Sequence, residues 1–183
     1  MFTVDKVHSS PARFDMKKLE AINGDKIRAL TLDEFLKWSL PFLTKAEVIT
    51  GTEEEIALVK QALPLIQERI VKLDEVPAML RFLFVKKFAV EEASLSKVTD
   101  GASKEVLKRT LAELTPLTTW NHGSIEAALR ASLIEEMGLK PRIAFGAVRI
   151  ATTGSTISPP LFESMELLGK ETSLARITAA INL

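Results

Sequence analysis

Several kinds of chemistry are excluded by residues that this sequence lacks. It has no cysteine, which rules out disulfide bonds and thiolate metal sites. Its two histidines, His8 and His122, lie far apart and do not have the spacing of paired zinc ligands. The eight glycines are scattered rather than gathered into a phosphate-binding loop. We therefore expect no metal site, no nucleotide loop and no serine–histidine–carboxylate catalytic set.

Long hydrophobic runs and a secretion signal are also missing. The chain opens on MFTVDK, without a charged and then apolar stretch. Its most apolar segment, residues 80–90, is interrupted by Arg81, Lys86 and Lys87. No run approaches the roughly 20 apolar residues that a membrane helix needs. We expect no membrane-spanning segment, and the absence of cysteine fits a reducing cytoplasm.

An excess of positive charge is absent as well. The 24 lysines and arginines are balanced by 24 acidic residues, so the formal net charge is zero. Proteins that hold nucleic acid regardless of its sequence do so by neutralising phosphates. Any affinity of this chain for RNA must therefore come from a local basic patch and from contacts with bases.

What the sequence does contain is a globular composition with helical periodicity. At 46% hydrophobic and 26% charged residues, its 183 residues can form one domain or two small subdomains that share a core. Capping boxes at residues 31–34 and 52–55 predict two helix starts. Pro64 predicts a kink or a break in the second of these helices. Residues 82–90 have no partner strand in the pattern, so we expect a buried connection there.

Together these patterns predict an all-α fold, a helical bundle in two small subdomains. We expect a first subdomain at residues 31–82 and a second at residues 83–183. Residues 1–30 hold too little apolar surface to fold alone and are expected to be the tail of a preceding domain. Other expectations concern single residues: a first helix ending at Gly24, a helix capped by Ser103, packed side chains at Trp38 and Trp120, and inward side chains at Met137 and Ile143.

The stretch that stands out runs from residue 149 to residue 170. Gly154 tolerates the positive φ that a sharp reversal needs. Ser158 is expected to cap a helix whose first residue is a proline and whose inward face includes Leu161. Arg149 would then lie just before the reversal, beside a helix N-terminus, in a corner suited to RNA. The alternative is a packed helix–turn–helix with a solvated arginine.

Two segments near opposite ends of the chain resemble a known family. Residues 154–171, GSTISPPLFESMELLGKE, resemble the C-terminal signature of bacterial glutamyl-tRNA synthetases, in their anticodon-binding region. Residues 12–28, ARFDMKKLEAINGDKIR, resemble the segment through which that family's chain reaches this region. The two segments stand in the family's order and at about its spacing, so the resemblance covers nearly the whole chain.

The resemblance implies the C-terminal anticodon-binding part of a glutamate–tRNA ligase, preceded by a stem-contact domain. The family's two ATP-binding signatures, of His-Ile-Gly-His and Lys-Met-Ser-Lys-Ser type, do not occur here. ATP and magnesium would belong to the missing catalytic domain, and this portion alone should make no glutamyl-adenylate. The implied partners are the anticodon loop of glutamate tRNA and that catalytic domain, with no DNA and no membrane, for a monomer in the cytoplasm.

The resemblance also implies which residues read the anticodon. Arg69 stands where many members carry an arginine that reads the third base, which differs between glutamate and glutamine tRNAs. Arg149 matches a position associated with the middle of the anticodon, and Ser158 and Leu161 match the helix start that lines the same base. Arginine suits this task because its planar fork can stack on a base and hydrogen-bond to base edges. The alternatives are a solvated arginine at Arg69 and core packing at Leu161.

Three residues of the N-terminal segment are further candidates for the anticodon stem or the first base: Lys18, Asn23 and Arg28. Ala21 stands where many relatives have a tryptophan, so the ring needed for base stacking is absent there. The alternative function is a helical protein-interaction module that keeps the fold without binding RNA. A stand-alone enzyme would need a catalytic set that the sequence lacks.

Overall fold

The computed structural model describes residues 15–85 and 87–183, and the predictions for residues 1–14 and for Lys86 lie outside this part of the chain. Its regular secondary structure is helical throughout, which confirms the all-α prediction for the described residues. The α-helices are α1 (Met16–Arg28), α2 (Leu32–Lys45), α3 (Glu53–Ala62), α4 (Pro64–Gln67), α5 (Val76–Leu80), α6 (Glu92–Thr99), α7 (Gly101–Leu114), α8 (His122–Leu129), α9 (Pro141–Thr153), α10 (Leu161–Leu168) and α11 (Lys170–Ile181). Two 3₁₀ turns, η2 (Leu73–Glu75) and η3 (Arg81–Leu83), and a π-helical segment, η4 (Arg130–Glu136), complete the series.

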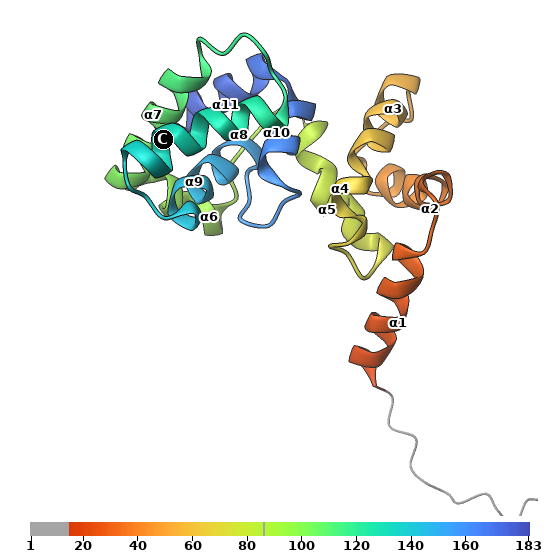
Figure 1. Cartoon of the computed structure of the whole chain (residues 1–183). Helices are drawn as coiled ribbons and strands as arrows, with labels where there is room; N and C mark the ends of the chain where they lie inside the picture. The colour runs from red at the N-terminus through yellow and green to blue at the C-terminus, as the bar shows by residue number, and fades with distance from the viewer. Residues whose placement is uncertain (1–14, 86) are drawn as a thin grey trace, which may run out of the picture.

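Two hydrophobic clusters organise these helices. The N-terminal cluster joins the end of α1 to α2–α5, with fully buried side chains that include Phe35, Leu63 and Leu80. The C-terminal cluster joins α6–α11, with Leu107 and Leu129 among its buried members. Figure 1 shows the two groups side by side, with α1 extending away from both. The exact domain boundaries expected from the sequence stay predictions.

Local signals placed several helix ends correctly. Thr31 and Thr52 each form a capping box, as predicted. The Glu55 carboxylate in the second box also accepts the backbone N–H of Gly51, at 2.8 Å. Pro64 begins α4 directly after α3, which confirms a break at the proline. A proline has no N–H to continue the helical ladder, so a new short helix starts there.

Two predicted helix ends are wrong, and one helix was missed. Helix α1 continues through Gly24 instead of ending there, since Gly24 is buried against a later segment and a Cβ would lie 3.2 Å from Val71 Cγ1. Helix α7 begins two residues before Ser103, because the Asp100 carboxylate accepts the Ser103 N–H at 2.9 Å and caps the helix. Helix α6 was not predicted at all.

Three side chains expected to pack are exposed instead. Met137 is 39% exposed, since the π-helical turn before it changes the helical register. Ile143 and Trp38 are 58% and 53% exposed, because the buried faces of α9 and α2 lie on neighbouring positions. Trp120 is packed as predicted, and its indole N–H donates to the Met165 carbonyl at 2.9 Å.

Candidate nucleic-acid interface

Arg149, on the last turns of α9, is held by the loop that follows it. Its Nη1 donates to Ser158 Oγ and to the Pro159 carbonyl, both at 2.6 Å. Ser158 is buried, and its hydroxyl also donates to the Pro159 carbonyl at 3.1 Å. Ser158 is therefore not the predicted helix cap: α10 begins only at Leu161, after an extended Pro160, and has no side-chain cap. The serine hydroxyl orients the arginine instead.

The reversal between Arg149 and Ser158 depends on a glycine, as predicted. Gly154 ends α9 with a φ of 86°, in the left-handed region. A Cβ on it would lie 2.9 Å from the Ala89 carbonyl oxygen, closer than real contacts allow. The Gly154 carbonyl in turn accepts the Glu91 N–H at 2.9 Å. The loop therefore lies directly against the segment that links the two clusters.

Leu161 lies inside the protein. It is 3% exposed and belongs to the C-terminal cluster. The core-packing alternative thus describes its side chain in this structure, where it supports the loop from within. A direct contact with a base stays a prediction.

Arg69 lies just beyond α4, and its side chain is exposed. Burial is the main cause that lowers the pKa of Arg149, and the positive charge of Arg69 is the next, while Glu163 opposes them. Arg69 and Arg149 are far apart in the sequence but close enough in the fold for their charges to interact. No hydrogen bond or direct contact joins them among the described residues.

Side-chain contacts from both sides of Arg69 hold this segment against α1 and the residues just after it. Gln67 Nε2 donates to the carbonyls of Ile27 and Leu30, both at 2.9 Å. Lys72 pairs with Glu20 at 3.5 Å. These contacts hold the segment from 67 to 72, which we call the Arg69 segment, while its arginine side chain faces solvent.

The candidates on α1 lie apart from the two arginines. Figure 1 shows this helix extending away from α9 and α10. The Asn23 amide donates to the Val71 carbonyl, and Arg28 pairs with Asp25 at 2.5 Å. Lys18 is exposed. Asn23 and Arg28 thus have structural partners, and their contacts with RNA stay predictions.

A surface groove of about 890 Å³ has Arg149 at its edge. Lys97 and Arg142 add two positive charges to its walls, against one carboxylate, from Asp100. The α9 backbone is open at Gly146, where a Cβ would meet nothing within 4 Å. A positive groove with apolar walls and an accessible helix backbone has the properties of a single-stranded nucleic-acid track.

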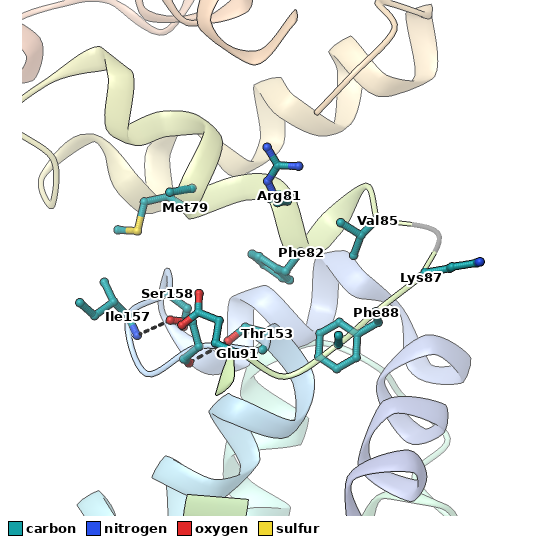
Figure 2. Close-up of a pocket in the computed structure, with 14 residues that line it drawn as sticks. Met79, Arg81, Phe82, Val85, Lys87, Phe88, Glu91, Thr153, Ile157 and Ser158 are labelled. Atoms are coloured by element: carbon teal, nitrogen blue, oxygen red, sulfur yellow. Dashed lines mark hydrogen bonds between the residues drawn. The ribbon is translucent and has the colours of Figure 1, made fainter. Parts of the chain in front are cut away.

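A smaller cavity, of about 250 Å³, lies on the other side of the same loop. In Figure 2, Met79 and Phe82 line it from the N-terminal side, while Ile157 and Ser158 line it from the loop. Ile157 is 75% exposed at this site. The loop after Arg149 therefore lies between the surface groove and the smaller cavity.

Comparison with known proteins agrees with this geometry. A family profile described as "Anticodon binding domain" matches residues 19–181. The chain belongs to this anticodon-binding domain family. The resemblance found at the two ends of the sequence is thereby confirmed, and it extends through the middle of the chain.

The relatives of this anticodon-binding domain are longer proteins. A glutamate–tRNA ligase from Saccharopolyspora erythraea is 45% identical over 183 residues, which cover 98% of this chain and 36% of the relative. One from Nocardioides sp. is 47% identical over 184 residues, covering 98% and 38%. The crystal structure of a glutamate tRNA ligase from Elizabethkingia meningosepticum matches with a TM-score of 0.75 at 20% identity, covering 99% of this chain and 35% of that one. The chain therefore spans little more than a third of these relatives.

Sequence patterns missed two residues that hold this anticodon-binding domain together. Gln67 fastens the Arg69 segment, and Arg176 of α11 donates to two carbonyls from other elements. A signal for Arg176 was present: it shares the inward face of α11 with Ser173 and Ile177. A charged residue on such a face needs buried partners.

Neither metal ligation nor membrane insertion has support in the described part of the domain. Across residues 15–85 and 87–183, no three His, Cys, Asp or Glu side chains are grouped so that they could hold a metal ion. Over the same ranges, no helix has the length and apolar character to cross a membrane.

Proposed function

We propose that this chain recognises the anticodon of glutamate tRNA as part of a glutamate–tRNA ligase, and so supplies tRNA specificity for aminoacylation. The observation that carries the proposal is the oriented guanidinium of Arg149, which Ser158 and the Pro159 carbonyl hold where it lines a positive groove. The catalytic part of the same synthetase is its partner, and ATP and magnesium act there. The cytoplasm, where tRNA is charged, is the proposed location, and the proposed form is a monomer.

Arg149 is prepared to read a base before RNA arrives. Its Nη1 is occupied by Ser158 and Pro159, which fixes the plane of the guanidinium. Among the described residues, no acceptor is bonded to its Nη2 or Nε. A half-buried arginine with donors unused gains from an acceptor on a base edge, and a fixed fork loses little entropy on binding. We assign Arg149 to the middle of the anticodon, with Ser158 and Leu161 shaping its site.

Arg69 is assigned to the third anticodon base. Its side chain is exposed, while Gln67, two positions before it, is hydrogen-bonded to the Ile27 carbonyl and holds the neighbouring backbone in place. It can therefore swing onto a base edge without moving the chain that carries it. Discrimination arises because the guanidinium donors match one base and leave unpaired groups against the other.

The groove suits the strand that joins the bases. Lys97 and Arg142 lie where phosphates of a single strand would pass. Because the net charge of the chain is zero, phosphate neutralisation depends on local groups of cations such as these. Binding should therefore depend on salt with a shallow slope, equivalent to a few phosphates.

The test is a binding titration at fixed, stated salt with anticodon stem-loops of glutamate tRNA and glutamine tRNA. We expect the unmodified chain to prefer the glutamate stem-loop and Arg69→Ala to lose that preference, by about 1–3 kcal/mol for one bidentate contact. Arg149→Ala should weaken binding of both stem-loops. The control is Lys108→Ala, which removes an exposed cation that pairs with Glu105 and does not line the groove.

Each outcome decides something. A preference that survives in Arg69→Ala contradicts the role of Arg69 while leaving the proposed function intact. Equal binding of both stem-loops by the unmodified chain contradicts the proposed function. If neither stem-loop shows salt-dependent binding, the helical protein-interaction module is favoured instead.

A further inference from the structure

Arg69 and Arg149 lie in segments that belong to different clusters. Arg69 lies between Ile66 and Ile70 of the N-terminal cluster, whereas Arg149 lies between Val148 and Ile150 of the C-terminal cluster. The separation of their guanidinium groups therefore depends on how one cluster is set against the other. The chain crosses between the clusters in the segment whose described residues are 81–85 and 87–91, which we call the connection.

Arg176 joins the connection to the end of α9. This arginine, on α11, is 7% exposed. Its Nη1 donates to the Thr152 carbonyl at 2.8 Å, and its Nη2 donates to the Phe82 carbonyl at 2.9 Å. Its guanidinium carbon lies 4.0 Å from the centroid of the Phe88 ring. The Arg176 side chain thus contacts both α9, three residues after Arg149, and the start of the connection, at Phe82.

Burying this cation is costly, which argues against a generic packing role. Burial lowers the pKa of Arg176 to about 10. Among the residues that the structure describes, no carboxylate lies within ion-pairing distance of it. Two carbonyls and one aromatic ring are its only recorded compensation. An apolar side chain would fill this space without the desolvation cost, so the contacts of the guanidinium are what distinguish this position.

The C-terminal end of the connection packs closely against the end of α9. The Ala89 carbonyl oxygen lies only 2.9 Å from the position that a Cβ of Gly154 would take, and the Glu91 N–H donates to the Gly154 carbonyl. Phe82, Phe88 and Thr153 all line the smaller cavity (Figure 2). The connection is therefore held at Phe82 and Phe88 by Arg176, and at its end by Gly154.

We propose that Arg176 is a positioning residue for anticodon recognition: by holding the connection against the end of α9, it sets the distance between Arg69 and Arg149. The inference rests on the proposed function for its consequence in RNA binding. Arg176 touches no RNA in this proposal. Its planar guanidinium can donate to two carbonyls while stacking on Phe88, which neither lysine nor methionine can reproduce in full.

A distance measurement between the clusters tests the positioning without RNA. The chain has no cysteine, so cysteines introduced at the exposed residues Ala57 of α3 and Ala112 of α7 can carry spin labels without interference. We expect a narrow distance distribution for the chain with Arg176, a broader or shifted one for Arg176→Met, and an intermediate one for Arg176→Lys. The control is Leu114→Ala, which leaves a cavity in α7 away from the connection.

A binding measurement tests the consequence. At a temperature where every variant is folded by circular dichroism, we expect Arg176→Met to reduce the preference for the glutamate stem-loop by about fivefold or more, within the range of one bidentate contact. Leu114→Ala should keep the preference. A positioning role also predicts that the preference in Arg176→Lys lies between those of the other two chains.

The proposal is overturned if Arg176→Met has the same distance distribution as the unmodified chain, or if Leu114→Ala loses the preference equally. Failure of the proposed function looks different. In that case the unmodified chain shows no preference between stem-loops, while the distances still decide whether Arg176 holds the joint.

Discussion

Arg149 and Arg69 are presented in opposite ways. Arg149 is held through its own side chain, by Ser158 and the Pro159 carbonyl, and the backbone after it reverses at once. Arg69 is exposed, and it is the backbone around it that is held, through Gln67. The Arg149 region therefore presents a guanidinium of fixed orientation. The Arg69 region presents an exposed side chain on a backbone that is held in place.

The difference teaches where each region can be broken. A fixed fork depends on the shape of its loop, so a backbone change there should be severe. The position of the Arg69 side chain depends on the hydrogen bonds of Gln67. Loss of these bonds should have a moderate effect, and it should reduce both selectivity between stem-loops and the stability of the fold. Contacts at the periphery of either region should have the smallest effect on stability.

The largest effect is expected from Gly154→Ala, which breaks the Arg149 region. The φ of 86° disfavours alanine, and the new methyl would lie 2.9 Å from the Ala89 carbonyl. We expect a loss of about 3 kcal/mol in the free energy of unfolding, measured by urea denaturation.

The matched control for that variant is Gly51→Ala. Gly51 also has a positive φ, of 97°, but a Cβ there would meet nothing within 4 Å. Its cost should be about 1 kcal/mol, from backbone strain alone. Equal losses in both variants would contradict the importance of the contact with Ala89.

A moderate effect is expected from Gln67→Ala, which removes the anchor of the Arg69 segment. The carbonyls of Ile27 and Leu30 would lose their donor, at a cost of about 1–2 kcal/mol in unfolding free energy. The preference between stem-loops should fall too, because the backbone below Arg69 loosens. Gln61→Ala, at an exposed position of α3, is the control and should change neither quantity. A Gln67→Ala chain with normal stability and preference would show that α1 does not support Arg69.

The smallest effect is expected at the outer end of α10, where Glu166 accepts the His122 backbone N–H at 2.9 Å and contacts its ring Nδ1 at 2.7 Å. The side-chain contact raises the pKa of His122 above its ordinary value of 6.5. The backbone bond from His122, followed by the side-chain bond, lowers the pKa of Glu166 below 4.5.

The sign of the pH dependence follows from these two directions. The raised pKa of His122 gives stability that is full below pH 6.5 and is lost as the pH rises through the folded value. The lowered pKa of Glu166 gives stability that is present above pH 4.5 and is lost as the pH falls through its folded value. Thermal unfolding should therefore show a shallow maximum of Tm between those limits, reduced in Glu166→Gln. An unchanged profile in that variant would contradict a contribution from the pair.

Predictions from the sequence succeeded where the deciding residues lie within a few positions of one another. The capping boxes at Thr31 and Thr52, the break at Pro64 and the left-handed turn at Gly154 are of this kind. Each depends on hydrogen bonds or steric limits inside one turn of chain, so the surrounding fold does not change the answer.

Two of the wrong predictions, at Ser158 and Gly24, have a different cause. Ser158 had the sequence of a helix cap, but its hydroxyl meets an arginine nine positions earlier instead of the next N–H groups. Gly24 had the sequence of a helix end, but it lies where α1 packs on Val71. In both places a tertiary partner offers a better contact than the local one, and tertiary contacts override local preference.

The sequence by itself determined the helical class, most helix starts, the family and the two arginines assigned to the anticodon. Local propensity, capping and family motifs are properties of short segments, which is why they could be read there. Only the tertiary structure decided that the charges of Arg69 and Arg149 interact, and that Arg176 donates to a carbonyl 94 positions away. Such contacts form when the two hydrophobic clusters pack together. Local sequence patterns do not determine the orientation of one cluster relative to the other.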